Sequence, residues 1–297
     1  MSSPRTTRTG AGTTAGSPGT EPTRTGPTGG EPTLSEPTGG EPTRGGLGGA
    51  IASEWTKLWS VRSVWWALLA SVLLMAATSA QLAIYVQNSN TDDDPGNDQG
   101  VLALGRIAID SLELTQFAVL AMAMLVITSE YANGSIRATL QWTPRRGHVI
   151  LAKATVVGAV TLVLGVLLGA LGSAVAAPVL GDWGRFDLPE SIVDALAVGA
   201  YLALISVFSL GVGAALRGVV ATLTSVFLIL TVVPATLSLP DVTVLNRIAD
   251  LLPGSAGRHF LRGETDPYPP VVGLLLLTGW VLLALLAGHT VLRRRDA

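Results

Sequence analysis

Apolar residues gather into six long runs between Val64 and the C-terminus, and only short polar connections separate these runs. A helix of roughly 20 mostly uncharged residues crosses the hydrocarbon core of a bilayer. The runs cover residues 64–86, 112–128, 156–179, 195–216, 219–239 and 271–292. The pattern predicts an all-α, polytopic membrane protein whose six transmembrane helices lie within residues 63–297.

Residues 47–62, which precede the first run, have the period of an amphipathic helix. Ile51, Trp55, Leu58 and Trp59 share one face, and polar side chains occupy the other. Tryptophan on an apolar face beside basic residues is typical of a helix in the headgroup layer. We therefore predict an interfacial helix in contact with the lipid bilayer, and the alternative is an extension of the first span.

Residues 1–46 have the composition of a disordered cytoplasmic tail. Gly, Pro and Thr dominate the segment, and the triplet Glu-Pro-Thr recurs between Glu21 and Thr43. Such a segment has too few apolar side chains to offset the entropy lost on ordering. It is interpreted as a flexible tether, and the alternative is a protein-binding or phosphorylated tail.

The composition agrees with a membrane protein and limits its chemistry. Charged residues make up 13% of the 297 residues, whereas soluble domains carry about a quarter. Cysteine is missing and the three histidines are widely spaced. We therefore expect no disulfide and no metal site. We also expect no cofactor in this chain and no nucleic-acid partner.

The basic residues favour one orientation in the membrane. Six crossings place both termini on one side, and the connections richer in Lys and Arg are cytoplasmic. One set of connections holds ten basic residues: Lys57, Arg62, Arg137, Arg145, Arg146, Lys153, Arg217, Arg293, Arg294 and Arg295. The other set holds five: Arg106, Arg185, Arg247, Arg258 and Arg262. Both termini are therefore predicted to be cytoplasmic.

Two features within the runs concern helix packing. Gly165, Gly169 and Gly172 give the third run a small-residue face, which permits close packing within the chain or against a second copy. Pro234 predicts a kink in the fifth run, where a neighbouring helix must contact the carbonyl that loses its donor.

The sequence has no enzyme signature. It contains no GxxxxGK[ST] phosphate-binding loop, no HExxH zinc motif and no GxSxG nucleophile turn. Ser255 and His259 are four residues apart, but the neighbouring Pro253, Gly254 and Gly257 favour an irregular turn over a catalytic pair. The ionisable residues at the span ends are expected to be solvated: Asp110, Glu113, Glu130, Lys153 and Asp194. We therefore expect no enzymatic activity in this chain.

The connection between the second and third runs carries the most informative motif. It reads SEYANGSIRATL from Ser129 to Leu140, and PRRG and Ala-Lys follow. Asn133-Gly134 predicts a turn, and Pro144 ends a short helix. A short ordered helix between two spans suits docking to a soluble partner, whereas an ordinary cytoplasmic loop would explain only the arginines.

This motif resembles the permease subunits of type-2 ABC exporters. The similarity extends to the stretch 53–58 and to 252–257, and it covers about residues 50–292. It implies a bacterial-type plasma membrane location and a separate ABC ATPase subunit that hydrolyses ATP. It also implies a second permease copy or a sister permease, and short re-entrant helices between the fifth and sixth spans.

The resemblance also implies where the ATPase docks. In that family, a short helix after the second span couples the permease to the ATPase, and the entry helix adds to the surface. The implied coupling residues are Glu54, Lys57, Glu130, Asn133, Gly134, Ile136, Arg137, Leu140, Arg145 and Arg146. The expected function is the membrane-spanning permease subunit of an ATP-driven exporter. The alternatives are a secondary transporter or channel, and a non-transporting membrane sensor or immunity protein.

Overall fold

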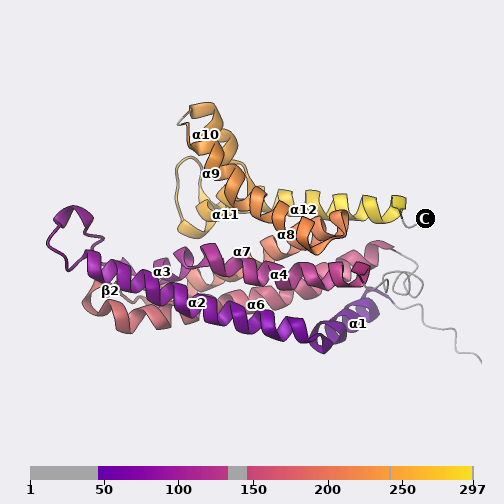
Figure 1. The fold of residues 1–297 in the computed structure, drawn as a ribbon, viewed down its shortest axis with the longest axis horizontal. Helices are drawn as coiled ribbons and strands as arrows, with labels where there is room; N and C mark the ends of the chain where they lie inside the picture. Colours follow the sequence, from indigo (N-terminus) through magenta and orange to yellow (C-terminus); the bar gives the residue numbers. More distant parts are fainter. Residues whose placement is uncertain (1–45, 133–145, 241, 296–297) are drawn as a thin grey trace, which may run out of the picture. The chain divides into compact units, whose positions relative to one another are not determined.

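The computed structural model of the chain describes residues 46–132, 146–240 and 242–295. In these residues six helical segments are long and apolar enough to cross a membrane, and helix α1 precedes them (Figure 1). The predicted all-α class with six spanning helices is thereby confirmed. The segments are α2 (Arg62–Ser89), α4 (Leu112–Ala132), α6 (Arg146–Leu180), α7 (Leu188–Leu216), the run from Val219 to Ser238, and α12 (Pro270–Arg295). The predicted tail lies, except for Gly46, outside the described residues.

Helix α1 (Leu47–Ser60) divides its apolar residues between the core and the exterior. Leu58 is buried with residues of α2, α4 and α6. Trp59 lies between Trp55 and Trp65, with ring centroids 5.7 and 5.2 Å apart, and both outer rings are exposed. The exposed indoles suit a headgroup layer, where an amphipathic ring meets both lipid and water.

Helix α7 forms the centre of the core because α4, α6 and α12 all pack against it. A Cβ atom on Gly165 would lie 2.7 Å from the Cα of Gly199 on α7, and one on Gly169 would lie 3.1 Å from the Cα of Ala195. Gly172 faces Met75 of α2. The small face of α6 therefore packs inside the chain, where backbones approach too closely for larger residues.

The fifth span is interrupted, as Pro234 predicts. Helix α8 (Val219–Phe227) passes through a wide π-turn, Leu228–Val232, into α9 (Val233–Ser238). Pro234 has no N–H to donate to the carbonyl of Leu230, four residues earlier. Gly254 packs against this carbonyl group, since a Cβ atom at Gly254 would lie 1.9 Å from its oxygen.

Two short helices, α10 (Thr243–Asp250) and α11 (Pro253–Arg262), occupy the connection before α12. The irregular turn expected around Ser255 is wrong, because Pro253 begins a helix; proline is favoured at a first helical position. The Ser255 hydroxyl accepts a hydrogen bond from Arg258, and His259 lies beside carboxylates. This arrangement does not support a Ser–His pair.

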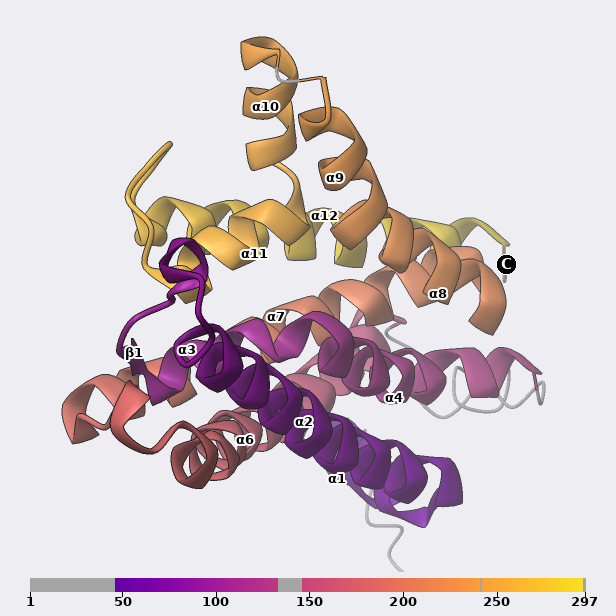
Figure 2. The same cartoon turned by 60° about the vertical axis from the view of Figure 1, so that its left-hand side comes forward.

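The connections gather at two opposite ends of the helices. Strand β1 (Leu102–Ala103) pairs in parallel with β2 (Gly184–Arg185). Helix α3 (Leu104–Asp110) follows β1 in the chain. In Figure 2, β1 and the C-terminus lie at opposite ends of the spans. Arg217 lies in the turn between α7 and α8. Its guanidinium group lies 5.1 Å from the ring centre of Tyr131 in α4.

Candidate functional site

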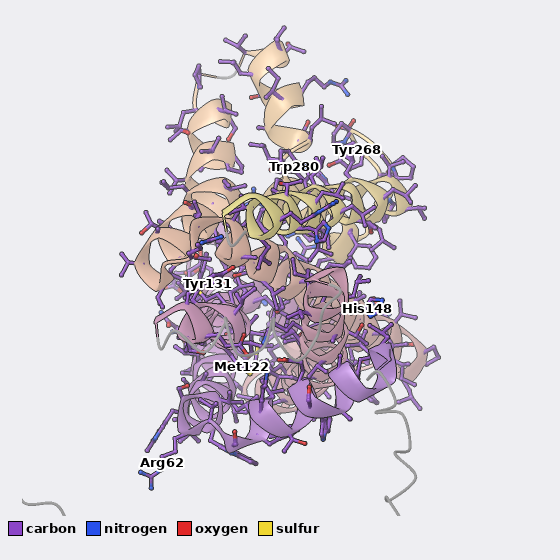
Figure 3. All side chains as sticks on the ribbon, turned by 90° about the vertical axis from the view of Figure 1, so that its right-hand side faces the viewer. Arg62, Met122, Tyr131, His148, Tyr268 and Trp280 are labelled. Atoms are coloured by element: carbon purple, nitrogen blue, oxygen red, sulfur yellow. The ribbon has the colours of Figure 1, made fainter. Side chains whose placement is uncertain are left out.

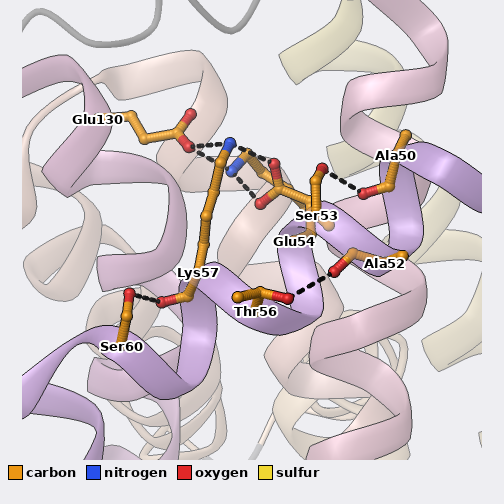
Figure 4. A network of polar contacts seen from close by, with 9 residues as sticks. Ala50, Ala52, Ser53, Glu54, Thr56, Lys57, Ser60 and Glu130 are labelled. Atoms are coloured by element: carbon orange, nitrogen blue, oxygen red, sulfur yellow. Dashed lines mark hydrogen bonds and ion pairs between the residues drawn. The ribbon is translucent and has the colours of Figure 1, made fainter. Parts of the chain in front are cut away.

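Four charged side chains meet where α1, α4 and α6 come together. The ammonium nitrogen of Lys153 lies 2.6 Å from Glu54 Oε2 and 2.8 Å from Glu130 Oε1. That of Lys57 lies 2.8 Å from Glu54 Oε1 and 3.3 Å from Glu130 Oε1. Figure 4 shows Glu54, Lys57 and Glu130 pointing toward one another. Each carboxylate thus contacts both lysines, and we call these four residues the ionic junction.

Helix geometry places each member of the junction. Glu54 and Lys57 are three residues apart on α1, so they project from neighbouring positions on one face. Glu130 lies in the last turn of α4. Lys153 lies two turns into α6, on the face that also carries the buried Val149, Ile150, Val156 and Val157. The junction therefore ties the entry helix to the facing ends of the second and third spans.

The junction is buried, and this corrects the expectation that Glu130 and Lys153 are solvated. The side chain of Lys153 is 0% exposed, that of Glu54 4% and that of Glu130 11%. Charges removed from water are stable only beside opposite charges that also form hydrogen bonds. Here α1 covers the span ends and supplies Glu54, and the two carboxylates balance the two ammonium groups. Among the described residues, Glu130 Oε2 is buried and has no hydrogen-bond partner.

Lys57 is the accessible member of the junction, with 45% of its side chain exposed. Burial lowers the pKa of Lys57, but the hydrogen bond and charge of Glu54 and the charge of Glu130 raise it more. Its net pKa therefore lies above the ordinary value, and Lys57 is charged at neutral pH. The carboxylates of Glu54 and Glu130 thus stabilise the positive charge of Lys57 at the solvent-facing side of the junction.

The remaining implied coupling residues lie in or next to the connection between α4 and α6. Six of them lie outside the described residues: Asn133, Gly134, Ile136, Arg137, Leu140 and Arg145. Arg146 begins α6, and its side chain is likewise outside the described part. Glu130 and Lys153 bracket this connection and contact each other. Because Glu54 and Glu130 are buried, their carboxylates contact the two lysines of the junction and are largely inaccessible from outside.

Lys153 is the functional candidate that sequence reasoning missed. A lysine at the edge of an apolar run resembles the basic residues that mark a cytoplasmic end, so the third span was predicted to begin at Val156. The available signal was helical spacing, since buried apolar residues stand three and four positions to either side. A charge on such a face needs a buried partner, and the sequence alone does not identify Glu54 as that partner.

No family model matches this chain, and no curated protein matches it.

Proposed function

We propose that this chain is the membrane-spanning permease subunit of an ATP-driven exporter and works with a separate ABC ATPase. The ionic junction carries the proposal. It joins α1, α4 and α6, and Glu130 precedes by three residues the connection 133–145, whose motif resembles the ATPase-coupling segment of type-2 exporters. A displacement of that connection would move all three helices together, because separating them would leave buried charges without partners.

In this mechanism the energy comes from the partner. ATP binding draws two ATPase subunits together, and they push on the connection between α4 and α6 of this permease and of a second copy or sister permease. The ionic junction passes the movement to the second and third spans and to α1. The spans then change from an inward-open to an outward-open arrangement, and this chain carries out no covalent reaction.

The position of the buried charges favours this class over a proton-coupled carrier. Among the described residues, the buried charged residues are Glu54, Glu130 and Lys153, and all three belong to the ionic junction at one end of the spans. A proton-coupled carrier uses ionisable side chains along a path through the membrane. The junction is instead suited to holding helices together beside a docking surface.

The proposed orientation predicts which connections react from outside the cell. The natural chain has no cysteine, so single substitutions give a clean background for a membrane-impermeant maleimide. We expect D93C, in the connection between α2 and α4, to react on intact cells. S135C should react only after the membrane is opened. Reaction of S135C on intact cells, with protection of D93C, would reverse the topology and remove the coupling mechanism.

Coupling to an ATPase predicts the effect of reversing a charge in the connection. With the chain reconstituted beside its ATPase, we expect R137E to reduce permease-dependent ATP hydrolysis by about tenfold, within the usual range of coupling between sites. The matched control is R185E, which changes an arginine in the connection between α6 and α7. Membrane insertion should be equal for both variants. Unchanged hydrolysis with R137E, or transport driven by a proton gradient without nucleotide, would contradict the proposal.

A further inference from the structure

A cavity of about 710 Å³ lies between α9, α10, α11 and the segment that leads to α12. Sites for small molecules are typically about 300–1,000 Å³, so the cavity is large enough for a ligand. Its lining is polar and includes Arg247, Arg258, Arg262 and His259. It lies in the connection between the fifth and sixth spans and is separate from the ionic junction.

Carboxylates engage only part of this basic lining. Arg262 lies 2.8 Å from Asp110, and His259 lies 3.6 Å from Asp250 and 3.4 Å from Glu264. The two remaining arginines have no carboxylate within ion-pair distance in the described part of the chain. Arg258 donates a hydrogen bond to the Ser255 hydroxyl at 3.3 Å, and Arg247 is exposed at the cavity wall.

One unengaged carboxylate also lines the cavity. Asp266 is exposed and has no ion pair among the described residues. The whole lining carries three arginines and three carboxylates, so it has no net positive charge when His259 is neutral. Arg247 and Arg258 are nevertheless the arginines without a carboxylate partner among the described residues, and their guanidinium donors are available to an anionic ligand.

The walls of the cavity are held in place before any ligand binds. Gly257 of α11 packs on the ring of Tyr201, because a Cβ atom there would lie 2.3 Å from a ring carbon. Two hydrogen bonds fix the C-terminal end of α10. The Tyr268 hydroxyl donates to the carbonyl of Asp250, and the Trp280 indole N–H donates to the carbonyl of Leu251, the next residue, at 2.9 Å. Figure 3 shows Tyr268 and Trp280 beside the upper helices. Burial, with a smaller contribution from the Asp250 charge, raises the pKa of Tyr268 to about 12, so its hydroxyl remains a donor.

We propose that this cavity binds a phosphate group through Arg247 and Arg258. The planar guanidinium fork matches two phosphate oxygens and forms two parallel charge-assisted hydrogen bonds. The hydroxyl groups of Thr243 and Ser255 line the same space and add neutral donors. The phosphate belongs either to a lipid headgroup or to a free phosphate ion.

The surface beside the cavity indicates which source to test first. Helix α10 places Arg247 on the cavity, while Val244 and Ile248 of the same helix are 66% and 47% exposed. An apolar face next to a phosphate site suits a molecule with an acyl chain. The inference does not depend on the proposed transport function, because binding is measured without an ATPase.

Calorimetric titration of the purified full-length chain in detergent tests the inference. The probes are dihexanoyl phosphatidic acid, inorganic phosphate, and dihexanoylglycerol as the lipid without phosphate. We expect the phosphatidic acid to bind and the double variant R247Q/R258Q to bind it at least about tenfold more weakly, or about 1.4 kcal/mol. The double variant R247K/R258K keeps the charge but loses the planar fork, and we expect an intermediate affinity.

The matched control is R185Q, which removes an exposed arginine that lies 2.7 Å from Glu190, between α6 and α7. It should bind phosphatidic acid as the natural chain does. Equal binding of inorganic phosphate would assign the site to free phosphate and still support the inference. The inference is overturned if neither phosphate compound binds, if dihexanoylglycerol binds equally well, or if R247Q/R258Q retains full affinity.

Discussion

Replacing Lys153 by methionine is expected to destabilise the folded chain by about 3–5 kcal/mol, the usual cost of breaking a buried ion pair. The methionine fits the volume of the lysine stem but leaves Glu54 and Glu130 buried with one ammonium group between them. Lys57 cannot replace the lost charge, because 45% of its side chain faces solvent and it already contacts both carboxylates. The two carboxylates would then repel each other and draw water into the contact between α1 and α6.

Thermal unfolding in detergent measures this effect, and limited proteolysis within α1 shows where the structure opens. The matched control is K57M, which also leaves one ammonium group for two carboxylates but opens the junction on its solvent-facing side, where water can enter. It should therefore cost more than the ~1 kcal/mol of an exposed ion pair but clearly less than K153M. The variant E54Q/E130Q/K153M removes the buried charges together and should recover much of the stability lost in K153M. If K153M unfolds at the same temperature as the natural chain, the ionic junction does not hold these helices together.

The spanning helices could be predicted from the sequence because bilayer thickness fixes their length and composition. Their first turns could not, because polar residues at the span ends look alike whether they face water or protein. Helix α6 begins at Arg146 rather than Val156 for this reason: Arg146, His148 and Lys153 interrupt the apolar pattern of its first turns, but α1 covers Lys153. Similarly, α7 begins at Leu188, where the Asp187 carboxylate accepts the Glu190 N–H at 3.0 Å as a helix cap.

The candidate site was predictable in its parts but not in its assembly. The motif around Glu54 and the motif around Glu130 are both visible in the sequence, and both were assigned to one surface. Their contact through Lys153 depends on how α1 folds back across α4 and α6, a long-range arrangement with no local sequence signal. The cavity below α10 was missed for the same reason, since Arg247 and Arg258 lie on separate helices whose angle the chain order does not fix.

Replacing Gly254 by alanine is expected to destabilise the fold by about 1–3 kcal/mol, the range for overpacking a tight contact. The added Cβ atom would lie 1.9 Å from the oxygen and 2.7 Å from the carbon of the Leu230 carbonyl group. A backbone carbonyl cannot rotate away as a flexible side chain would, and Pro234 maintains the wide turn that presents this carbonyl group. Helix α11 would therefore have to move away from the fifth span.

The matched control for this variant is G279A in α12, where a Cβ atom would meet nothing within 4 Å. That substitution should stabilise the helix by about 0.5–1 kcal/mol, because alanine loses less backbone entropy than glycine. Opposite shifts of the unfolding temperature for the two alanine variants would show that contact, rather than helix propensity, decides the result. G254A should also weaken phosphatidic acid binding, because α11 carries Arg258. A stabilised G254A with full affinity would mean that α11 is not seated on the Leu230 carbonyl.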